Sequence, residues 1–238
     1  MTVVTAAPIV WEFGASKRLT IPAAAHTYAG FLAWVTADDF PEKLRVTFDD
    51  GMVELDMSEE AIDSHAEVKA GVYRTLLPLV AEEDFGRLYS DGVLLCNQAA
   101  ELATNPDGVA AHWKTLKAGK VTFIEFGGVK RALDGTPDWV MEIVSDSSIK
   151  KDAITLRAVY HRAGIPEYWL IDARGDTIEF QILNWRRTGY CAAPSKDGWT
   201  PSKVFGRAFR LVRKQDRLGT WLYTLEVRRD ASKPKARQ

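Results

Sequence analysis

The chain has 238 residues, of which 46% are hydrophobic and 26% charged, and its formal net charge is −1. A hydrophobic fraction of this size suffices for one domain with a substantial core, whereas the near-zero charge gives no overall attraction to nucleic acid, so a polyanionic partner would need a local basic patch. No apolar run reaches the roughly 20 residues that cross a bilayer and no signal-peptide pattern opens the chain, so we expect a cytoplasmic protein that does not contact membranes.

The first half of the chain predicts two helices and a hairpin. A helix is expected over 22–36, with a proline tolerated in its first turn. Apolar residues that alternate on both sides of an Asp-Asp-Gly turn at 49–51 predict a β-hairpin. Apolar residues at helical spacing then predict a helix over about 64–82, and strand candidates follow at 87–96 and around 105–109.

The second half places a strand, a helix and another strand in close succession. A hairpin is expected over 120–133, and an apolar strand over 139–144 follows it. The next helix, over about 152–163, ends at Gly164, and the strand 168–172 comes directly after it. Further short strands are expected at 178–183, 190–194, 209–212 and 221–227. This order favours an α/β domain.

The domain is expected to cover residues 21–227, with a short segment on either side. Residues 1–20 form an N-terminal extension. Residues 228–238 are basic and poor in apolar side chains, which is typical of a disordered tail.

Glu142 is the acidic residue inside the apolar strand 139–144. A buried carboxylate costs free energy unless it is paired, protonated or bound to a metal. Asp138 lies on the same face of the strand but four residues away, about 13 Å, so these two cannot hold one ion alone. A second ligand must come from a neighbouring strand, and Asp107 in an Asn-Pro-Asp sequence is the best candidate. Alternatively, Glu142 is a structural residue paired with an arginine, and Asp138 only shapes the start of its strand.

Two carboxylates on facing strands repel each other unless a cation or a proton lies between them. A divalent ion removes the repulsion, lowers the pKa of a bound water and neutralises charge in a transition state. A nearby cationic side chain would stabilise the developing negative charge. Lys151, just past the strand, and Arg157, in the following helix, are the candidates. Lys151 also fits an ordinary solvated helix start.

Several blocks of this sequence resemble those of the PD-(D/E)xK nuclease superfamily and, more closely, those of the Uma-type putative restriction endonuclease family. The resemblance covers about residues 20–185 and rests on DDGMVELDMS followed by His65, and on NPDGV, PDWVMEIVSDSS and AGIPEYWLID. It implies an α/β fold with a restriction-endonuclease-like core, that is, a mixed β-sheet flanked by helices, with additional β-hairpins at the ends.

The resemblance also implies roles for individual residues. Asp107 matches the family's first aspartate and Glu142 its strand glutamate, which makes both ligands of Mg²⁺ or Mn²⁺, with Asp138 as a further candidate. Glu54 matches a position where the family has an acid, and His65 follows it in the same block. Each also has an ordinary interpretation, Glu54 as a solvated strand residue and His65 as a capping or surface residue.

The family's lysine is missing from both of its usual positions. Val144 occupies the third position of the Glu-x-Lys motif, and Leu156 occupies the alternative position, four residues before the helix residue Tyr160. Lys151 or Arg157 must therefore substitute, or the site is impaired.

The resemblance implies a metal-dependent endonuclease that hydrolyses DNA, with a homodimer supplying two active sites for two strands. The missing lysine motivates an alternative, a catalytically impaired nuclease fold that binds nucleic acid or protein. A sugar hydrolase would need two acids about 5–9.5 Å apart and no metal, and nothing in the sequence places them so.

Overall fold

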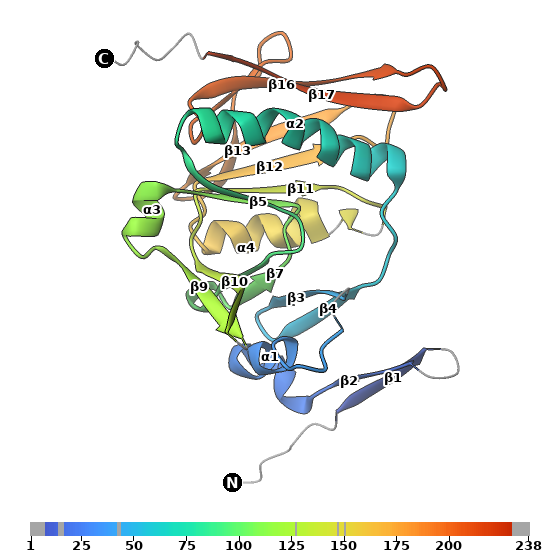
Figure 1. The fold of residues 1–238 in the computed structure, drawn as a ribbon, viewed down its shortest axis with the longest axis vertical. Helices are drawn as coiled ribbons and strands as arrows, with labels where there is room; N and C mark the ends of the chain where they lie inside the picture. Colours follow the sequence, from blue (N-terminus) through green and yellow to red (C-terminus); the bar gives the residue numbers. More distant parts are fainter. Residues whose placement is uncertain are drawn as a thin grey trace.

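The computed structural model describes residues 8–13, 17–41, 44–126, 128–146, 148–149 and 151–229. Two six-stranded mixed sheets form the body of the molecule, a two-stranded hairpin projects at one end, and a three-stranded sheet covers the other end (Figure 1). The mixed α/β architecture agrees with the predicted fold class. The predicted tail lies outside the described residues from 230 onward.

The central sheet has the spatial order β14-β13-β12-β11-β8-β5. Its strands are β14 (Gly189–Ala192), β13 (Glu179–Arg186), β12 (Glu167–Asp172), β11 (Trp139–Ile143), β8 (Gly108–His112) and β5 (Gly86–Ser90). β11 pairs in parallel with β12 and antiparallel with β8. The predicted strand–helix–strand unit is therefore confirmed, and its two strands are neighbours.

The second large sheet has the order β4-β3-β7-β6-β10-β9. Its strands are β4 (Met52–Asp56), β3 (Arg45–Asp49), β7 (Leu102–Thr104), β6 (Leu94–Asn97), β10 (Val129–Gly135) and β9 (Val121–Phe126). The β3–β4 and β9–β10 hairpins are those expected from the sequence.

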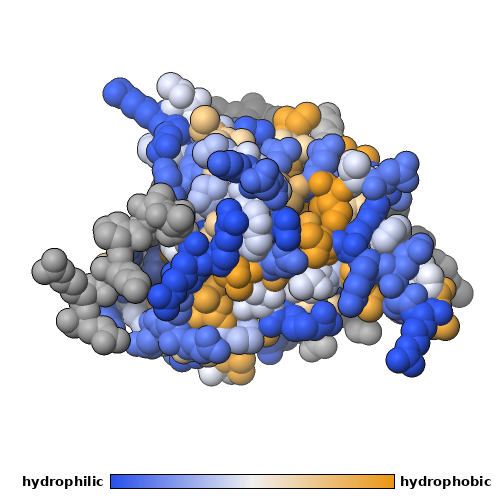
Figure 2. Space-filling view, turned by 90° about the horizontal axis from the view of Figure 1, so that it is seen from above, coloured by the Kyte–Doolittle hydropathy of each residue, from blue (hydrophilic) through white to orange (hydrophobic). Residues whose placement is uncertain are grey.

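Two smaller sheets complete the strands. β1 (Ile9–Phe13) and β2 (Lys17–Ile21) form the projecting N-terminal hairpin, and β15 (Thr200–Ser202), β16 (Arg207–Gln215) and β17 (Trp221–Arg229) form the C-terminal sheet. Seen from above, the C-terminal face is a mosaic in which short hydrophobic streaks lie among hydrophilic side chains (Figure 2).

Helices connect and cover the sheets. They are α1 (Tyr28–Val35), α2 (Glu67–Glu82), α3 (Trp113–Lys117) and α4 (Arg157–Arg162). A π-helical turn precedes α2 at Ile62–Ala66 and another precedes α4 at Lys151–Leu156, which confirms the two long predicted helices. α2 lies between the central sheet and β17 (Figure 1). In the described part of the chain, each helix is too short or too polar to cross a lipid bilayer.

Strand alternation in β11 separates two apolar clusters. Trp139, Met141 and Ile143 pack in the cluster that contains α2 and the C-terminal sheet. Val140 packs on the opposite side, in the cluster that contains α4. Glu142 shares that second face, as its position in the strand predicts.

Two predicted elements differ from the structure at their boundaries. The helix expected over 22–36 is divided at Thr27, which has extended backbone angles and accepts a hydrogen bond from the Gly30 N–H, so it acts as the N-cap of α1. The strand expected over 87–96 is two strands in different sheets. They separate at Asp91 and Gly92, which both have positive φ angles and form a turn.

Candidate active site

An acidic pocket lies where β8 begins, beside β11, the β3–β4 hairpin and the two π-helical turns. Its charged lining consists of seven carboxylates, one arginine, one lysine and one histidine among the described residues. The carboxylates belong to Glu54, Asp56, Glu59, Glu60, Asp107, Glu142 and Asp152, and the basic residues are Arg45, Lys151 and His65. Such an excess of negative charge favours a cation.

The Asp107–Glu142 pair is built by the β8–β11 ladder. Gly108 lies opposite Met141, so Asp107 precedes β8 beside the end of β11. The Asp107 Oδ2 atom accepts a hydrogen bond from the Ile143 N–H at 2.8 Å, and the Asp107 N–H donates to Glu142 Oε2 at 3.4 Å. The structure therefore brings together the two acids that the sequence pairs across neighbouring strands.

One stripe of α2 and its preceding turn points at Asp107. His65 Nε2 lies 3.2 Å from Asp107 Oδ2, and Lys69 Nζ lies 3.0 Å from Asp107 Oδ1. The Tyr73 hydroxyl donates to the backbone carbonyl of Asp107. The spacing of four residues between these side chains places them on one helix face.

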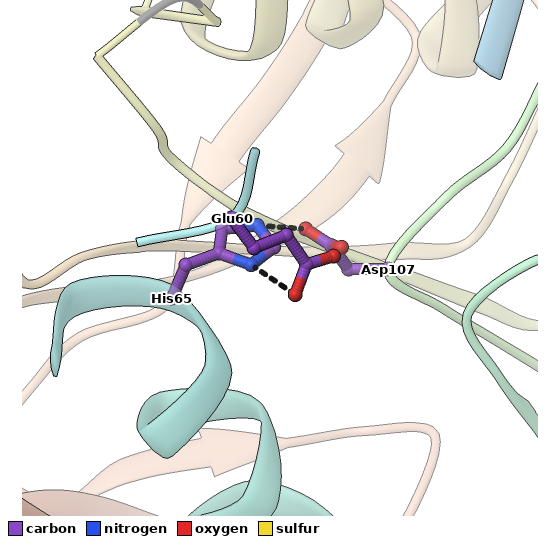
Figure 3. Close-up of side chains that lie close together, drawn as sticks. All are labelled: Glu60, His65 and Asp107. Carbon is purple, nitrogen blue, oxygen red and sulfur yellow. Dashed lines mark ion pairs between the residues drawn. The ribbon is translucent and has the colours of Figure 1, made fainter. Parts of the chain in front are cut away.

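Glu60 is the second carboxylate that contacts His65. One ring nitrogen of His65 pairs with Asp107 and the other with Glu60 (Figure 3), and the Nδ1 atom is 3.3 Å from Glu60 Oε2. Ligand atoms of these three residues lie within 4.8 Å of one another. However, Lys69 Nζ lies 2.9 Å from Glu60 Oε1, and Arg45 also pairs with Glu60.

This side of the pocket is balanced in charge. Lys69 Nζ and Arg45 also contact Asp91, at 3.0 Å and 3.1 Å. Burial raises the pKa of Asp107, but the hydrogen bond from His65 and the charge of Lys69 lower it to about 2. Burial lowers the pKa of His65, but its contact with Asp107 raises it overall. The three carboxylates thus face Lys69, Arg45 and the imidazole of His65, which leaves less attraction for a metal ion than on the other side.

The Glu142 side of the pocket is not balanced. Glu142 is 5% exposed and Asp152 is 2% exposed. Burial and the charges of Asp152 and Asp107 raise the pKa of Glu142 well above its usual range. Burial raises the pKa of Asp152 to about 7, although Ser148 donates a hydrogen bond to its Oδ2 atom. The Tyr160 hydroxyl donates to Glu142 Oε1.

Asp152 has an unsatisfied oxygen. Its Oδ1 atom is buried and has no hydrogen-bond partner among the residues that the structure describes. Burying a carboxylate oxygen without a hydrogen-bond donor costs free energy. Hard divalent cations bind oxygen ligands and can satisfy such an atom. The pocket interior holds about 30 Å³, more than the roughly 10–15 Å³ that one water needs. The chemistry of these carboxylate donors, rather than a set of ligand distances, suits a small hydrated cation.

Lys151 supplies the cationic side chain on this side. It lines the pocket, and its Nζ atom lies 3.7 Å from Asp56 Oδ2. Burial lowers the pKa of Lys151, but the charges of Glu142 and Asp152 raise it overall. Glu54, on β4, also lines the pocket. An ammonium group is thus present although Val144 occupies the usual lysine position.

The missing lysine positions belong to the apolar core. Val144 is 3% exposed and Leu156 is 1% exposed, and both pack in the cluster beneath α4. A lysine at either position would have to leave that cluster to reach the pocket. Of the two predicted substitutes, Lys151 lines the pocket and Arg157 does not. The Arg157 guanidinium donates to the Tyr190 carbonyl at 3.1 Å and lines a separate cavity.

Asp138 lies away from the pocket, whereas His65 lines it. Because β8 and β11 are antiparallel, Asp138 lies at the end of the pair opposite to Asp107, where its carboxylate accepts from the His112 N–H at 2.8 Å. It does not line the pocket, so we do not include it among the proposed ligands. His65, predicted as a site residue with a capping or surface role as the alternative, is buried in contact with Asp107.

Three residues of this site were missed in the sequence. Lys69 could have been found from its spacing after His65, which puts both on one helix face. Asp152 follows Lys151 directly and starts the same helical segment. Glu60 carries no such signal, because it lies in the segment before the π-helical turn and contacts the site only through the tertiary fold.

Comparisons with known proteins agree with this fold. A family model described as "Uma2: Putative restriction endonuclease" matches residues 29–213. The crystal structure of a putative nuclease belonging to DUF820, from Anabaena variabilis ATCC 29413, is similar with a TM-score of 0.55 and 16% sequence identity, over 75% of this chain and 90% of that chain. At this identity the similarity shows the fold alone. None of the curated proteins matches the chain.

Proposed function

The chain belongs to the Uma2 family, described as putative restriction endonucleases, and from this premise we propose that it is a Mg²⁺- or Mn²⁺-dependent endonuclease that hydrolyses DNA. The observation that carries the proposal is the unbalanced acidic half of the pocket, formed by Glu142 and Asp152 beside Asp107. We propose Glu142 and Asp152 as metal ligands, together with Asp107. Asp107 pairs with basic side chains of the balanced half but lies beside Glu142, at the border of the two halves. The family match over 29–213 supports one catalytic domain over about 21–227. A cytoplasmic location and a homodimer stay predictions.

A divalent cation in this pocket would supply a Lewis acid that lowers the pKa of a water molecule and neutralises phosphate charge. The protein's own residues would orient the reaction. Asp107 is fixed by His65, Lys69 and the Ile143 N–H, so its carboxylate is held in one orientation. Hydrolysis forms a bond from the water oxygen to phosphorus and breaks one bond from phosphorus to a sugar oxygen.

Lys151 is proposed to assist this step. Its ammonium group lies in the pocket and can pair with a phosphate oxygen as negative charge develops there. Its presence supports catalysis over the alternative of a binding-only protein, which the apolar residues Val144 and Leu156 at the usual lysine positions suggested. Glu54 lines the outer part of the same pocket, and we propose that it orients water rather than holds the ion.

Calorimetric titration of Mn²⁺ into the protein tests the proposed ligands. We expect binding by the wild type, and loss of at least about tenfold in affinity in Glu142→Gln and in Asp152→Asn. Glu60→Gln is the matched control, because Glu60 lines the balanced half of the pocket, and it should keep wild-type affinity. Absence of binding in the wild type would overturn the proposal. Loss of Mn²⁺ affinity in Glu60→Gln alone would instead assign the ion to Glu60, His65 and Asp107.

Cleavage of labelled DNA with Mn²⁺ tests the role of Lys151. Lys151→Met should lower the cleavage rate by roughly 10²-fold, while Mn²⁺ binding persists. Arg157→Met is the control, since the structure places Arg157 against Tyr190 outside the pocket, and its rate should stay near that of the wild type. Equal losses in both variants would contradict the assignment.

A further inference from the structure

One larger hollow shares lining residues with the acidic pocket, and a second shares lining residues with the first. The first has a volume of about 260 Å³ and shares Val46 and Asn105 with the pocket. The second has a volume of about 450 Å³ and shares Arg131 and Ala132 with the first. The second hollow opens at the surface between α3 and β9, and it lies on the other face of the β6–β10 pair, because its apolar lining belongs to the cluster around Leu133 and that of the first hollow to the cluster around Ala132.

The second, outer hollow combines aromatic rings with cations. Arg87 lies over the ring of Trp113, with 5.3 Å between the guanidinium carbon and the ring centroid. The Lys130 ammonium lies 4.9 Å from the centroid of the Phe123 ring. All four side chains line the outer hollow, and Arg131 is a lining residue of both hollows. We call these five residues the strand track.

The segment that carries most of the strand track is basic. Residues 113–131 contain five lysines and arginines but a single glutamate, although the whole chain has a net charge of −1. Lys114, Lys117, Lys120, Lys130 and Arg131 are exposed. The inner hollow has Asp38 as its acidic residue and Arg131 as its basic residue among the described residues. The local positive charge is thus complementary to a phosphate backbone.

The rings indicate which form of nucleic acid fits. Phe123 is 39% exposed, and Trp113 is partly exposed beside it along the same hollow. Exposed aromatic and guanidinium planes stack on bases that are not already stacked in a duplex. Basic side chains interleaved with such planes are the usual surface for a single strand.

We propose that the strand track binds single-stranded DNA. The inference rests on the proposed function, because a strand held on this surface would be the substrate of the endonuclease. It names the substrate as an unpaired strand, either a free strand or an unpaired segment of a longer duplex. Bases stack on Phe123 and Trp113, and Arg87, Lys130 and Arg131 contact the phosphates.

Fluorescence anisotropy with a labelled oligothymidylate of about 20 nucleotides tests this proposal, since single-strand sites cover roughly 4–16 nucleotides. The titration is done with chelator, so that no cleavage occurs. The wild type should bind the single strand more tightly than a duplex of the same length. Phe123→Ala should weaken binding by about 10-fold, because stacking on one ring contributes about 1–3 kcal/mol. Arg131→Gln should reduce the slope of log affinity against log salt by about 0.7.

Two matched controls come from other surfaces. Trp185 is also 39% exposed but lines a hollow near Gly164, so Trp185→Ala should bind like the wild type. Arg217 is exposed in the turn between β16 and β17, so Arg217→Gln should keep the wild-type salt slope. Thermal melting checks that each variant is folded.

The outcomes separate this inference from the proposed function. The strand track is wrong if the wild type does not bind the single strand, if a duplex binds equally well, or if both track variants bind like the wild type. In the last case DNA cleavage with Mn²⁺ can still be present, and the proposed function stands. Conversely, track variants that lose binding in a protein without any metal-dependent cleavage would support the track and overturn the endonuclease.

Discussion

Two glutamates on neighbouring strands of the central sheet are both buried, yet their surroundings differ. Glu167 on β12 lies opposite Trp139, and Glu142 on β11 lies opposite Leu170. Glu167 accepts four hydrogen bonds, from Ser202, from the Trp169 indole at 2.8 Å, and from two backbone N–H groups at 2.8 Å and 3.3 Å. Glu142 accepts from the Tyr160 hydroxyl and from one backbone N–H, and faces two other carboxylates.

The surroundings of Glu167 and Glu142 distinguish a structural carboxylate from a candidate metal ligand. Both side chains have raised pKa values because of burial. At Glu167 the hydrogen-bond donors oppose the rise in pKa and satisfy both carboxylate oxygens. The C-terminal segment therefore packs over a carboxylate whose hydrogen bonds are complete. At Glu142 the charges of neighbouring acids add to the rise in pKa, and the side chain lines a pocket. Burial of an acid is therefore a weak signal, and the balance of donors and like charges around it decides its role.

The largest effect should come from removing the structural member of the pair. Glu167→Ala leaves four donors without their acceptor, so we expect a loss of about 3–5 kcal/mol in the free energy of unfolding. Urea denaturation of the metal-free protein measures it. Glu142→Gln should cost far less, because glutamine resembles the protonated form that the raised pKa favours. Equal losses of unfolding free energy in the two variants would contradict the distinction between Glu167 and Glu142.

A middle-sized effect should depend on pH at Asp152. Its pKa is about 7 in the folded protein, against an ordinary value of 3.8. Between these values the folded state holds a proton that the unfolded state has lost, so this group makes the metal-free protein less stable as pH rises toward 7, with no further change above it. Asp152→Asn cannot titrate there and should be more stable than the wild type by about 2 kcal/mol at pH ~8.

The same comparison at pH ~4 is the control, because Asp152 is then protonated in the folded state and the difference between the two proteins should largely disappear. Urea denaturation with chelator at both pH values measures it. A constant difference at the two pH values would mean that the Asp152 carboxylate is stabilised by a donor and does not resemble Glu142.

The sequence predicted those parts of the site that follow from local periodicity. Alternation in β11 placed Glu142 on the face opposite to Trp139, Met141 and Ile143. The pairing of Glu142 with Asp107 followed from the need for a second carboxylate on an adjacent strand. The partners of Asp107 were not predictable in this way. Lys69 and Glu60 reach it because α2 packs across the sheet, and that packing depends on apolar contacts spread over the whole chain.

Asp138 shows the limit of strand alternation and gives the smallest expected effect. Alternation assigned it to the face of Glu142, but the antiparallel direction of β8 puts it beside His112, at the end of the strand pair away from Asp107. Asp138→Asn keeps an oxygen that can accept from the His112 N–H, so unfolding free energy should change by less than about 0.5 kcal/mol. Mn²⁺ affinity, measured by the same calorimetric titration, should stay within about twofold of the wild type, since that factor corresponds to less than 0.5 kcal/mol. A tenfold loss would require the Asp138 carboxylate to act on the pocket through the β8–β11 ladder, and the division between donor-satisfied and uncompensated carboxylates would then no longer describe this sheet.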